Sequence, residues 1–182
     1  MNRNIATGIT IALALGTGFS LVALAGDIEA GDHMEMAAVL KAPVTPTQAV
    51  KIAESGGGTA YGYGMEANQH GHWYEVDVLR GGAKLLLRID ASSGKVLGSS
   101  VAHGEDAQGA HALTGSKLTF GQAIAKAERV GHGPALEADS AGHGDSAHVD
   151  VDVIQNHGRR VAHYRVSMHN GQVRSILTGS DS

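Results

Sequence analysis

Three side chains in the C-terminal part of the sequence could together bind a transition metal. His148 and Asp150 lie two residues apart, and His163 follows a polar turn that would return its strand beside theirs, opposite Asp152 or Asp150. Neutral imidazole suits copper, zinc and nickel, and a carboxylate can act as third ligand or orient a histidine. The sequence therefore offers a candidate metal site formed by His148, Asp150 and His163.

The competing interpretation, which we take as the leading one, assigns no metal to these residues. Opposite charges on neighbouring strands stabilise a sheet by pairing, and Glu75 with Arg88 would form the same kind of pair earlier in the chain. The chain has 11 histidines, most of them in glycine-rich segments where a polar ring is simply solvated. We therefore predict no cofactor and keep copper or zinc at His148, Asp150 and His163 as the alternative.

Composition and motifs exclude several other functions. The chain of 182 residues contains no cysteine, which excludes disulfides, thiolate metal sites and cysteine nucleophiles. It has no HExxH helix, no GxSxG turn and no glycine-rich phosphate loop following a strand. The formal net charge is -4 and no basic run is present, so nucleic-acid binding is not expected. We predict that the protein is not an enzyme.

The N-terminus has the organisation of an export signal. One arginine precedes an uncharged run from Ile5 to Ala25, which ends in the small-residue triplet Ala23-Leu24-Ala25. We predict a signal peptide over residues 1–25, cleaved after Ala25, and a periplasmic or secreted mature protein without membrane attachment. The alternative is an uncleaved anchor, because the uncharged run is long enough to span a bilayer.

The segments that would position the candidate residues occur twice in the sequence, as an internal repeat. A helix-like segment beginning at Thr45 recurs at Thr119, 74 positions later (119 − 45), and Val76 corresponds to Val151 at an offset of 75 (151 − 76). An offset that grows only in loops indicates duplication of one supersecondary unit. The two helical segments share a threonine, a glutamine, two alanines and a glutamate: Thr45, Gln48, Ala49, Ala53 and Glu54 in the first, and Thr119, Gln122, Ala123, Ala127 and Glu128 in the second.

Each copy is predicted to fold as one helix followed by antiparallel strands. Thr45 and Thr119 are good N-caps, and alanines at helical spacing would let each helix lie close on a sheet. The following segments alternate with period two, which places Val76 and Val151 under the helices. We therefore predict an α+β fold of two repeated units, each one helix packed on a small antiparallel sheet, which pack together or share a sheet.

The duplication divides the chain into five regions. We expect the leader before the first repeat to be flexible or to begin a short helix. The linker between the repeats is rich in small residues, so we expect it to be flexible or only partly ordered. The regions are a signal peptide over 1–25, an N-terminal leader over 26–43, a first repeat over 44–100, a linker over 101–116 and a second repeat over 117–178.

The order of these segments resembles the PepSY domain, a small α+β module of exported bacterial proteins and of the propeptides of secreted metallopeptidases. The resemblance rests on "TPTQAVKIAES", "YEVDV" and "RIDASSGKVL", and the second copy departs from it where Ser167 replaces Asp90. It implies an exported, non-enzymatic binding module that regulates or inhibits a peptidase or another envelope protein, which would be its partner. The alternative is a periplasmic protein that binds copper, zinc or nickel through its histidine-rich loops.

Overall fold

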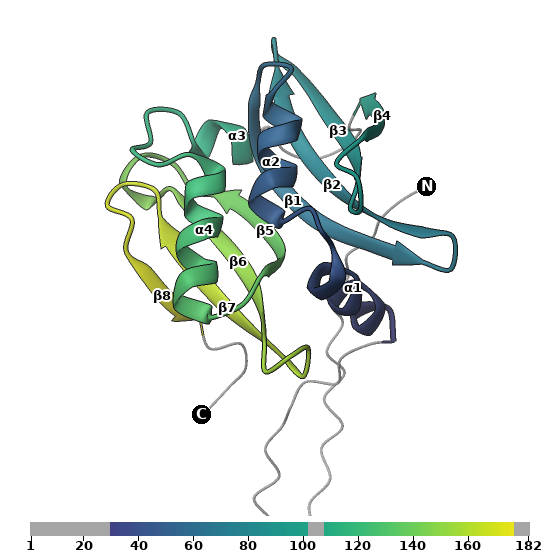
Figure 1. Ribbon diagram of the computed structural model, residues 1–182. Coiled ribbons are helices and arrows are strands. Elements are labelled where there is room, and N and C mark those ends of the chain that lie inside the picture. The colour runs from purple at the N-terminus through teal and green to yellow at the C-terminus, as the bar shows by residue number, and fades with distance from the viewer. Residues whose placement is uncertain (1–29, 102–107, 177–182) are drawn as a thin grey trace, which may run out of the picture.

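The computed structural model describes residues 30–101 and 108–176 (Figure 1). The predicted signal peptide and its cleavage site lie outside the described residues, as does part of the predicted linker. The helices are α1 (Ala30–Lys41), α2 (Pro46–Glu54), α3 (Gln108–Ala112), α4 (Phe120–Gly131) and the short 3-10 helix η1 (Gly144–Ser146). The strands are β1 (Thr59–Asn68), β2 (Gly71–Arg80), β3 (Ala83–Asp90), β4 (Val96–Val101), β5 (Ala135–Ala141), β6 (His148–Gln155), β7 (Arg160–Ser167) and β8 (Val173–Ile176).

All eight strands form a single antiparallel sheet in the order β4-β3-β2-β1-β5-β6-β7-β8. The predicted fold of two repeated helix-on-sheet units is therefore wrong. The difference comes from β1 and β5, two strands that the sequence analysis did not predict and that pair with each other at the centre of the sheet. Because this pairing is continuous with the hairpins on either side, the strands cannot be divided into two separate sheets.

The sequence repeat corresponds to an internal twofold arrangement within this one sheet. Tyr63 of β1 pairs with Val76 of β2, and Ala138 of β5 pairs with Val151 of β6 at the matching position. Tyr63 and Ala138 also pair with each other, at the middle of the three residue pairs that join β1 to β5. The residue pairing on the β1–β2 side of the Tyr63–Ala138 pair is thus equivalent to the pairing on the β5–β6 side.

One face of the sheet is covered by helices, and the core lies between these two layers. Figure 1 shows α2 and α4 side by side on this face; α2 packs on β1, β2 and β3, and α4 on β5, β6 and β7. The repeated alanines of the two helices have no exposed surface, which allows this close approach. The fully buried alanines are Ala49, Ala53, Ala123 and Ala127.

Within the described ranges, no helix is long and apolar enough to cross a membrane.

The repeated polar residues explain how α2 and α4 begin and how each is joined to the sheet. The side-chain oxygens of Thr45 and Thr119 each accept a hydrogen bond from the backbone N–H of a glutamine three residues later, and the backbone N–H of each threonine donates one to the side-chain oxygen of that glutamine. Beyond each helix, the last repeated residue reaches the next strand: Glu54 accepts from the N–H of Ala60, and Glu128 from the N–H of Ala135, both at 3.0 Å. The duplicated motif is therefore a set of hydrogen bonds that fixes a helix to a strand.

Two further helices lie in segments predicted as leader and linker. Met36 of α1 is 1% exposed and belongs to the same buried cluster as the alanines of α2 and α4, and α1 packs on β1 and β5. In the predicted linker, Ala110 and Ala112 of α3 are buried, and the Ser140 hydroxyl lies 2.8 Å from the carbonyl oxygen of Gly109. Both segments thus contribute ordered helices that pack on the central strands.

Candidate functional site

The face of the sheet opposite the helices carries carboxylates at neighbouring register positions. Gly62 of β1 lies between Asp77 of β2 and Asp139 of β5, and Gly64 occupies the equivalent place in the next row. A side chain at Gly62 would meet the Asp77 carboxylate at 2.8 Å, so the glycine leaves room for that acidic group. We call this surface the polar face; its acidic residues are Glu75, Asp77, Glu137, Asp139, Asp150 and Asp152.

The predicted metal ligands lie on the polar face, in β6 and β7. The strand register places His163 opposite Asp152, and its Nδ1 lies 2.5 Å from the Asp152 Oδ1. Asp150 faces Arg165, whose guanidinium donates two hydrogen bonds of 2.7 Å to the two carboxylate oxygens. The structure therefore pairs His163 with Asp152 and Arg165 with Asp150 across β6 and β7.

His148 lies beside Asp150, but the three predicted ligands do not converge on one point. The His148 Nε2 is 3.7 Å from the Asp150 Oδ2, and its Nδ1 is 2.7 Å from the carbonyl oxygen of Ser146. His163 instead contacts the neighbouring carboxylate, Asp152. Among residues 30–101 and 108–176, no group of three or more His, Asp or Glu side chains is arranged to hold a metal ion. A metal at His148, Asp150 and His163 stays a prediction from the sequence.

A melting experiment tests the metal prediction directly. We expect Cu(II) or Zn(II) to cause no saturable rise in the melting temperature that depends on these histidines, because Asp150 is already held by Arg165. The mature protein and a His148→Ala, His163→Ala double variant would be melted with and without each metal near pH 8 and pH 5.5. A rise seen only near pH 8 and only with both histidines present would establish the metal site, since its imidazoles must be neutral to bind.

The His163–Asp152 pair makes stability depend on pH. The hydrogen bond that His163 donates to the Asp152 carboxylate raises the pKa of His163 above its ordinary value, against the opposing effect of partial burial. A raised pKa means that the stabilisation is fully present below the unfolded value of about 6.5 and is lost as pH rises through the folded pKa. Because the His163 side chain is 33% exposed, solvent screening limits the effect to roughly 0.5 kcal/mol.

We therefore expect the wild-type free energy of unfolding to fall between about pH 6 and pH 9 by more than that of His163→Gln. Urea unfolding at both pH values measures this difference. His72→Gln, at an exposed histidine of β2, is the matched control and should keep the wild-type pH dependence. Equal pH dependence of the wild type and His163→Gln would exclude a stabilising charge on His163.

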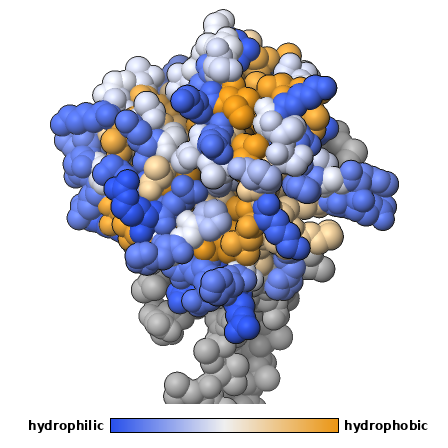
Figure 2. All heavy atoms as spheres, in the orientation of Figure 1, coloured by the Kyte–Doolittle hydropathy of each residue, from blue (hydrophilic) through white to orange (hydrophobic). Residues whose placement is uncertain are grey.

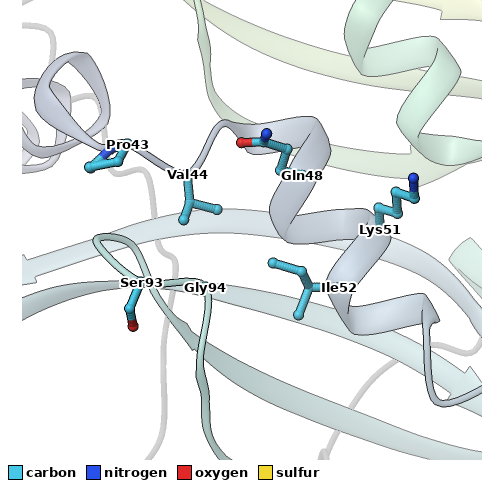
Figure 3. A pocket seen from close by; sticks show the side chains of 7 residues that line it. All are labelled: Pro43, Val44, Gln48, Lys51, Ile52, Ser93 and Gly94. Carbon is cyan, nitrogen blue, oxygen red and sulfur yellow. The ribbon is translucent and has the colours of Figure 1, made fainter.

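A second candidate site is an apolar hollow on the helix-covered side of the sheet. It has a volume of about 320 Å³ and lies between α2, the segment before it and the turn that joins β3 to β4 (Figure 3). Val44 and Ile52 are half-buried and form its apolar part, while Lys51 stands at its rim on α2. The residues that line it are Pro43, Val44, Gln48, Lys51, Ile52, Ser93 and Gly94.

Hydrogen bonds to the sheet hold one wall of the hollow. The Tyr74 hydroxyl donates to the carbonyl oxygen of Val44 at 2.6 Å, and the Val44 N–H donates to Ala91 at 3.2 Å. Burial is the main reason why the pKa of Tyr74 rises to about 12, so the hydroxyl keeps its proton as a donor. The segment that carries Val44 is thus fixed to β2 and to the end of β3.

The turn that forms the opposite wall is fixed by Asp90. Its Oδ1 accepts hydrogen bonds from the Ser92 and Ser93 hydroxyls and from both of their backbone N–H groups. The bonds from Ser92 and Ser93 lower the pKa of Asp90 to about 2, so this network is intact at neutral pH. Gly94 closes the turn with φ of 73°, and a Cβ there would lie 3.0 Å from Ile52. Both walls are therefore preformed.

Strand β4 continues the hollow along the edge of the sheet. All six of its residues are exposed, including Val96 at 44%, Leu97 at 54% and Val101 at 58%. Val96 pairs with the buried Ile89, which places it on the same side of the sheet as the hollow, and Leu97 is the extra residue where the β3–β4 register shifts. Within the described part of the chain, β4 pairs only with β3. We call Val96, Leu97 and Val101, together with the hollow, the β4 edge surface.

Apolar side chains reach the surface at other places on this side of the molecule as well. Figure 2 shows apolar patches separated by hydrophilic residues in the view that faces the helices. Val130 of α4 is 49% exposed, and Met34 and Leu40 of α1 are similarly exposed. What distinguishes β4 is that its apolar side chains belong to a strand whose outer backbone edge has no pairing strand among the residues that the structure describes.

Comparisons with known proteins give little further information. No protein-family model matches the chain, and no curated protein matches it either. A crystal structure of a protein from Clostridium difficile 630, described as a putative lipoprotein, aligns with 73% of this chain and 94% of its own. The sequence identity is 17% and the TM-score 0.41, too low to support an argument about fold family or function. The resemblance to PepSY domains stays a prediction from the sequence.

Sequence reasoning missed the β4 edge surface. The hollow combines α2 with a turn some 40 positions later, and no periodicity in either segment shows that they are neighbours. The available signal was the sequence "VLGSSV" of β4, where apolar residues follow a predicted turn without the alternation of a half-buried strand.

Proposed function

We propose that this protein is an exported, non-enzymatic binding module that binds a segment of another protein at the β4 edge surface. The observation that supports the proposal most directly is the exposure of Val96, Leu97 and Val101 on a strand that, within residues 30–101 and 108–176, pairs along one edge only. Natural sheets usually protect such edges with charges, proline or a covering element, because they pair readily with another chain. Addition of an extended segment to a sheet edge is a common mode of protein recognition.

The regulated partner in this proposal is an extracytoplasmic peptidase or another envelope protein. Location outside the cytoplasm rests on the export signal predicted over residues 1–25. The choice of a peptidase rests on the resemblance to PepSY domains, which accompany secreted peptidases. The binding mode and the partner class thus have independent support, and they can fail independently.

Inhibition of secreted peptidases tests the proposal. Cleavage rates of a panel of secreted metallopeptidases and serine peptidases would be measured with and without the mature protein. We expect at least one enzyme to be inhibited. Leu97→Asp should weaken that inhibition by tenfold or more, because burying a carboxylate at an apolar contact costs about 1.4 kcal/mol or more of binding free energy. The matched control is Val130→Asp, which introduces the same charge at a similarly exposed apolar residue of α4.

The outcomes separate the two parts of the proposal. Equal inhibition by the wild type, Leu97→Asp and Val130→Asp would exclude the β4 edge as the binding surface. Failure to inhibit any enzyme in the panel would contradict the peptidase as partner class. Far-ultraviolet circular dichroism of each variant checks that the sheet has formed before its inhibition is interpreted.

A further inference from the structure

Asn170, in the turn between β7 and β8, is the only asparagine of the sequence that is followed directly by glycine. This turn joins the last two strands, at the opposite edge of the sheet from the β4 edge surface. Asn170 is exposed, and Gly171 has a φ of 71° and no side chain to shield its backbone nitrogen. The side-chain amide of Asn170 is thus next to an unshielded backbone nitrogen.

Two hydrogen bonds hold Asn170 in this turn. The Gln172 N–H donates to the Asn170 Oδ1 at 2.9 Å, and the Asn170 N–H donates to the Ser167 hydroxyl at 3.4 Å. Because Gln172 is two residues further along the chain, the first bond folds the side chain along the backbone and holds its Cγ near the Gly171 nitrogen. The same N–H withdraws electrons from the carbonyl group and would stabilise negative charge on Oδ1.

A lysine of α4 adds positive charge at the same place. A Cβ at Gly171 would lie 3.2 Å from the Lys126 Nζ, so the ammonium group stands beside the Gly171 backbone. A positive charge there favours loss of the proton from the Gly171 N–H and favours negative charge on the Asn170 Oδ1. In the equivalent turn of the first half, the apolar Ile52 takes this place beside Gly94.

We propose that Asn170 is a site of spontaneous deamidation, which Lys126 accelerates. The deprotonated nitrogen of Gly171 attacks the Asn170 Cγ and closes a succinimide ring, and the side-chain nitrogen leaves as ammonia with the proton that Gly171 lost. Water then opens the ring at either carbonyl, which gives aspartate or isoaspartate without oxidation or reduction. Holding the reacting atoms together in one turn raises the rate, as in other intramolecular reactions.

One backbone hydrogen bond opposes the reaction and must open first. The Gly171 N–H donates to the Ser167 carbonyl oxygen at 2.8 Å, which keeps the nitrogen from attacking. Strand β8 has four residues and, within residues 30–101 and 108–176, pairs with β7 alone. Such an edge opens at a low free-energy cost, so the reaction proceeds from brief openings of the turn.

The modification changes this edge of the sheet. Either product replaces a neutral amide with a carboxylate. The aspartate side chain can still accept from the Gln172 N–H, which preserves the turn. Isoaspartate instead carries the chain through its side chain, which lengthens the backbone of the turn and weakens the adjacent pairing of Val166 with Val173.

Peptide mapping by mass spectrometry measures the modification. The purified protein would be incubated for several weeks at neutral pH in heavy-oxygen water and then digested in ordinary water, which identifies conversion during digestion. We expect Asn170 to gain a solvent oxygen and to become aspartate and isoaspartate before Asn68 or Asn156 reacts. Those two asparagines precede Gln69 and His157, whose side chains hinder attack. An unmodified Asn170, or equally fast conversion of the other two, would overturn the proposal.

Variants of Lys126 identify the role of its charge. Lys126→Gln should slow the conversion of Asn170 by about threefold, and Lys126→Arg should restore most of the rate because it keeps the positive charge. Ser93→Asn is the matched comparison, since it creates an Asn-Gly pair in the β3–β4 turn. There the Lys95 N–H already donates to the Ser93 hydroxyl at 3.3 Å, but Ile52 stands in place of the lysine. The introduced asparagine should react more slowly than Asn170.

The outcomes separate the modification site from the role of the lysine. Equal rates in the wild type and Lys126→Gln would overturn the role of Lys126, as would a slow rate in both Lys126→Gln and Lys126→Arg, which would indicate packing rather than charge. Conversion in Ser93→Asn as fast as that of Asn170 would also overturn it. Far-ultraviolet circular dichroism checks that each variant has formed the sheet before its rate is compared.

Discussion

Replacing Gly133 with alanine is expected to destabilise the protein by about 3 kcal/mol or more. A Cβ at this position would lie 1.8 Å from the carbonyl oxygen of Ile154, well inside any possible contact distance. That oxygen belongs to the backbone of β6, and the Ile154 N–H is itself bonded to Pro134 at 2.9 Å, so the strand cannot easily move aside. Urea unfolding of Gly133→Ala against the wild type measures the loss.

Gly64→Ala is the matched control for this substitution. Gly64 lies within β1, its φ is not positive, and a Cβ there would have open space around it. The expected change in the free energy of unfolding is within about 0.5 kcal/mol. Similar losses at Gly133 and Gly64 would show that the segment between α4 and β5 does not approach β6 as closely as described.

The second large effect is expected from shortening valines in the centre of the sheet. Val76 and Val151 are 0% and 1% exposed at equivalent positions of β2 and β6, beneath α2 and α4. Each substitution with alanine removes buried methyl groups and leaves a cavity, which should reduce the free energy of unfolding by about 1–3 kcal/mol. Val96→Ala removes the same atoms from a residue that is 44% exposed and should have an effect below about 0.5 kcal/mol.

Differential scanning calorimetry or urea unfolding can rank these three variants. An effect of Val96→Ala as large as that of Val76→Ala would mean that β4 is covered in the free protein, which would also undermine the proposed binding surface. A negligible effect of Val151→Ala, with a normal effect of Val76→Ala, would indicate that the second half of the core is loosely packed.

The sequence predicted helices α2 and α4 and the buried sides of several strands. Their signals are local: a threonine cap with a glutamine three residues later, and valines that alternate with polar residues. The buried positions of Val76 and Val151 are confirmed. Glu75 lies on the predicted outer face yet is only 8% exposed, because Trp73 and Arg88 contact its carboxylate. Alternation predicts the direction of a side chain but not what covers it.

The two strands that decide the fold class have the weakest local signals. Tyr63 and Met65 of β1 alternate with Gly62 and Gly64, and glycine disfavours strands because it loses much entropy and offers no side chain to pack. Strand β5, "ALEADSA", contains no β-branched or aromatic residue. Each is supported by a partner about 75 residues away, which a local pattern cannot show, so two separate units were predicted in place of one sheet.

The sequence does not determine the register of the β6–β7 hairpin, which carries the candidate metal residues. The sequence allowed His163 to face Asp152 or Asp150. The turn between β6 and β7 uses left-handed backbone conformations at Asn156 and His157, and it places His163 opposite Asp152. Asp150 then faces Arg165, a stronger and permanently charged partner, and this follows only from the length and conformation of the turn.

The junction of β1 and β5 has a consequence for how the sheet assembles. Only three residue pairs, centred on Tyr63 and Ala138, connect the two halves of the sheet directly. As an interface between two independent molecules, so short a junction would depend on protein concentration. Covalent connection makes the encounter intramolecular, with an effective concentration on the order of millimolar. Because both halves belong to one chain, their pairing is a unimolecular folding step rather than a concentration-dependent contact between two molecules.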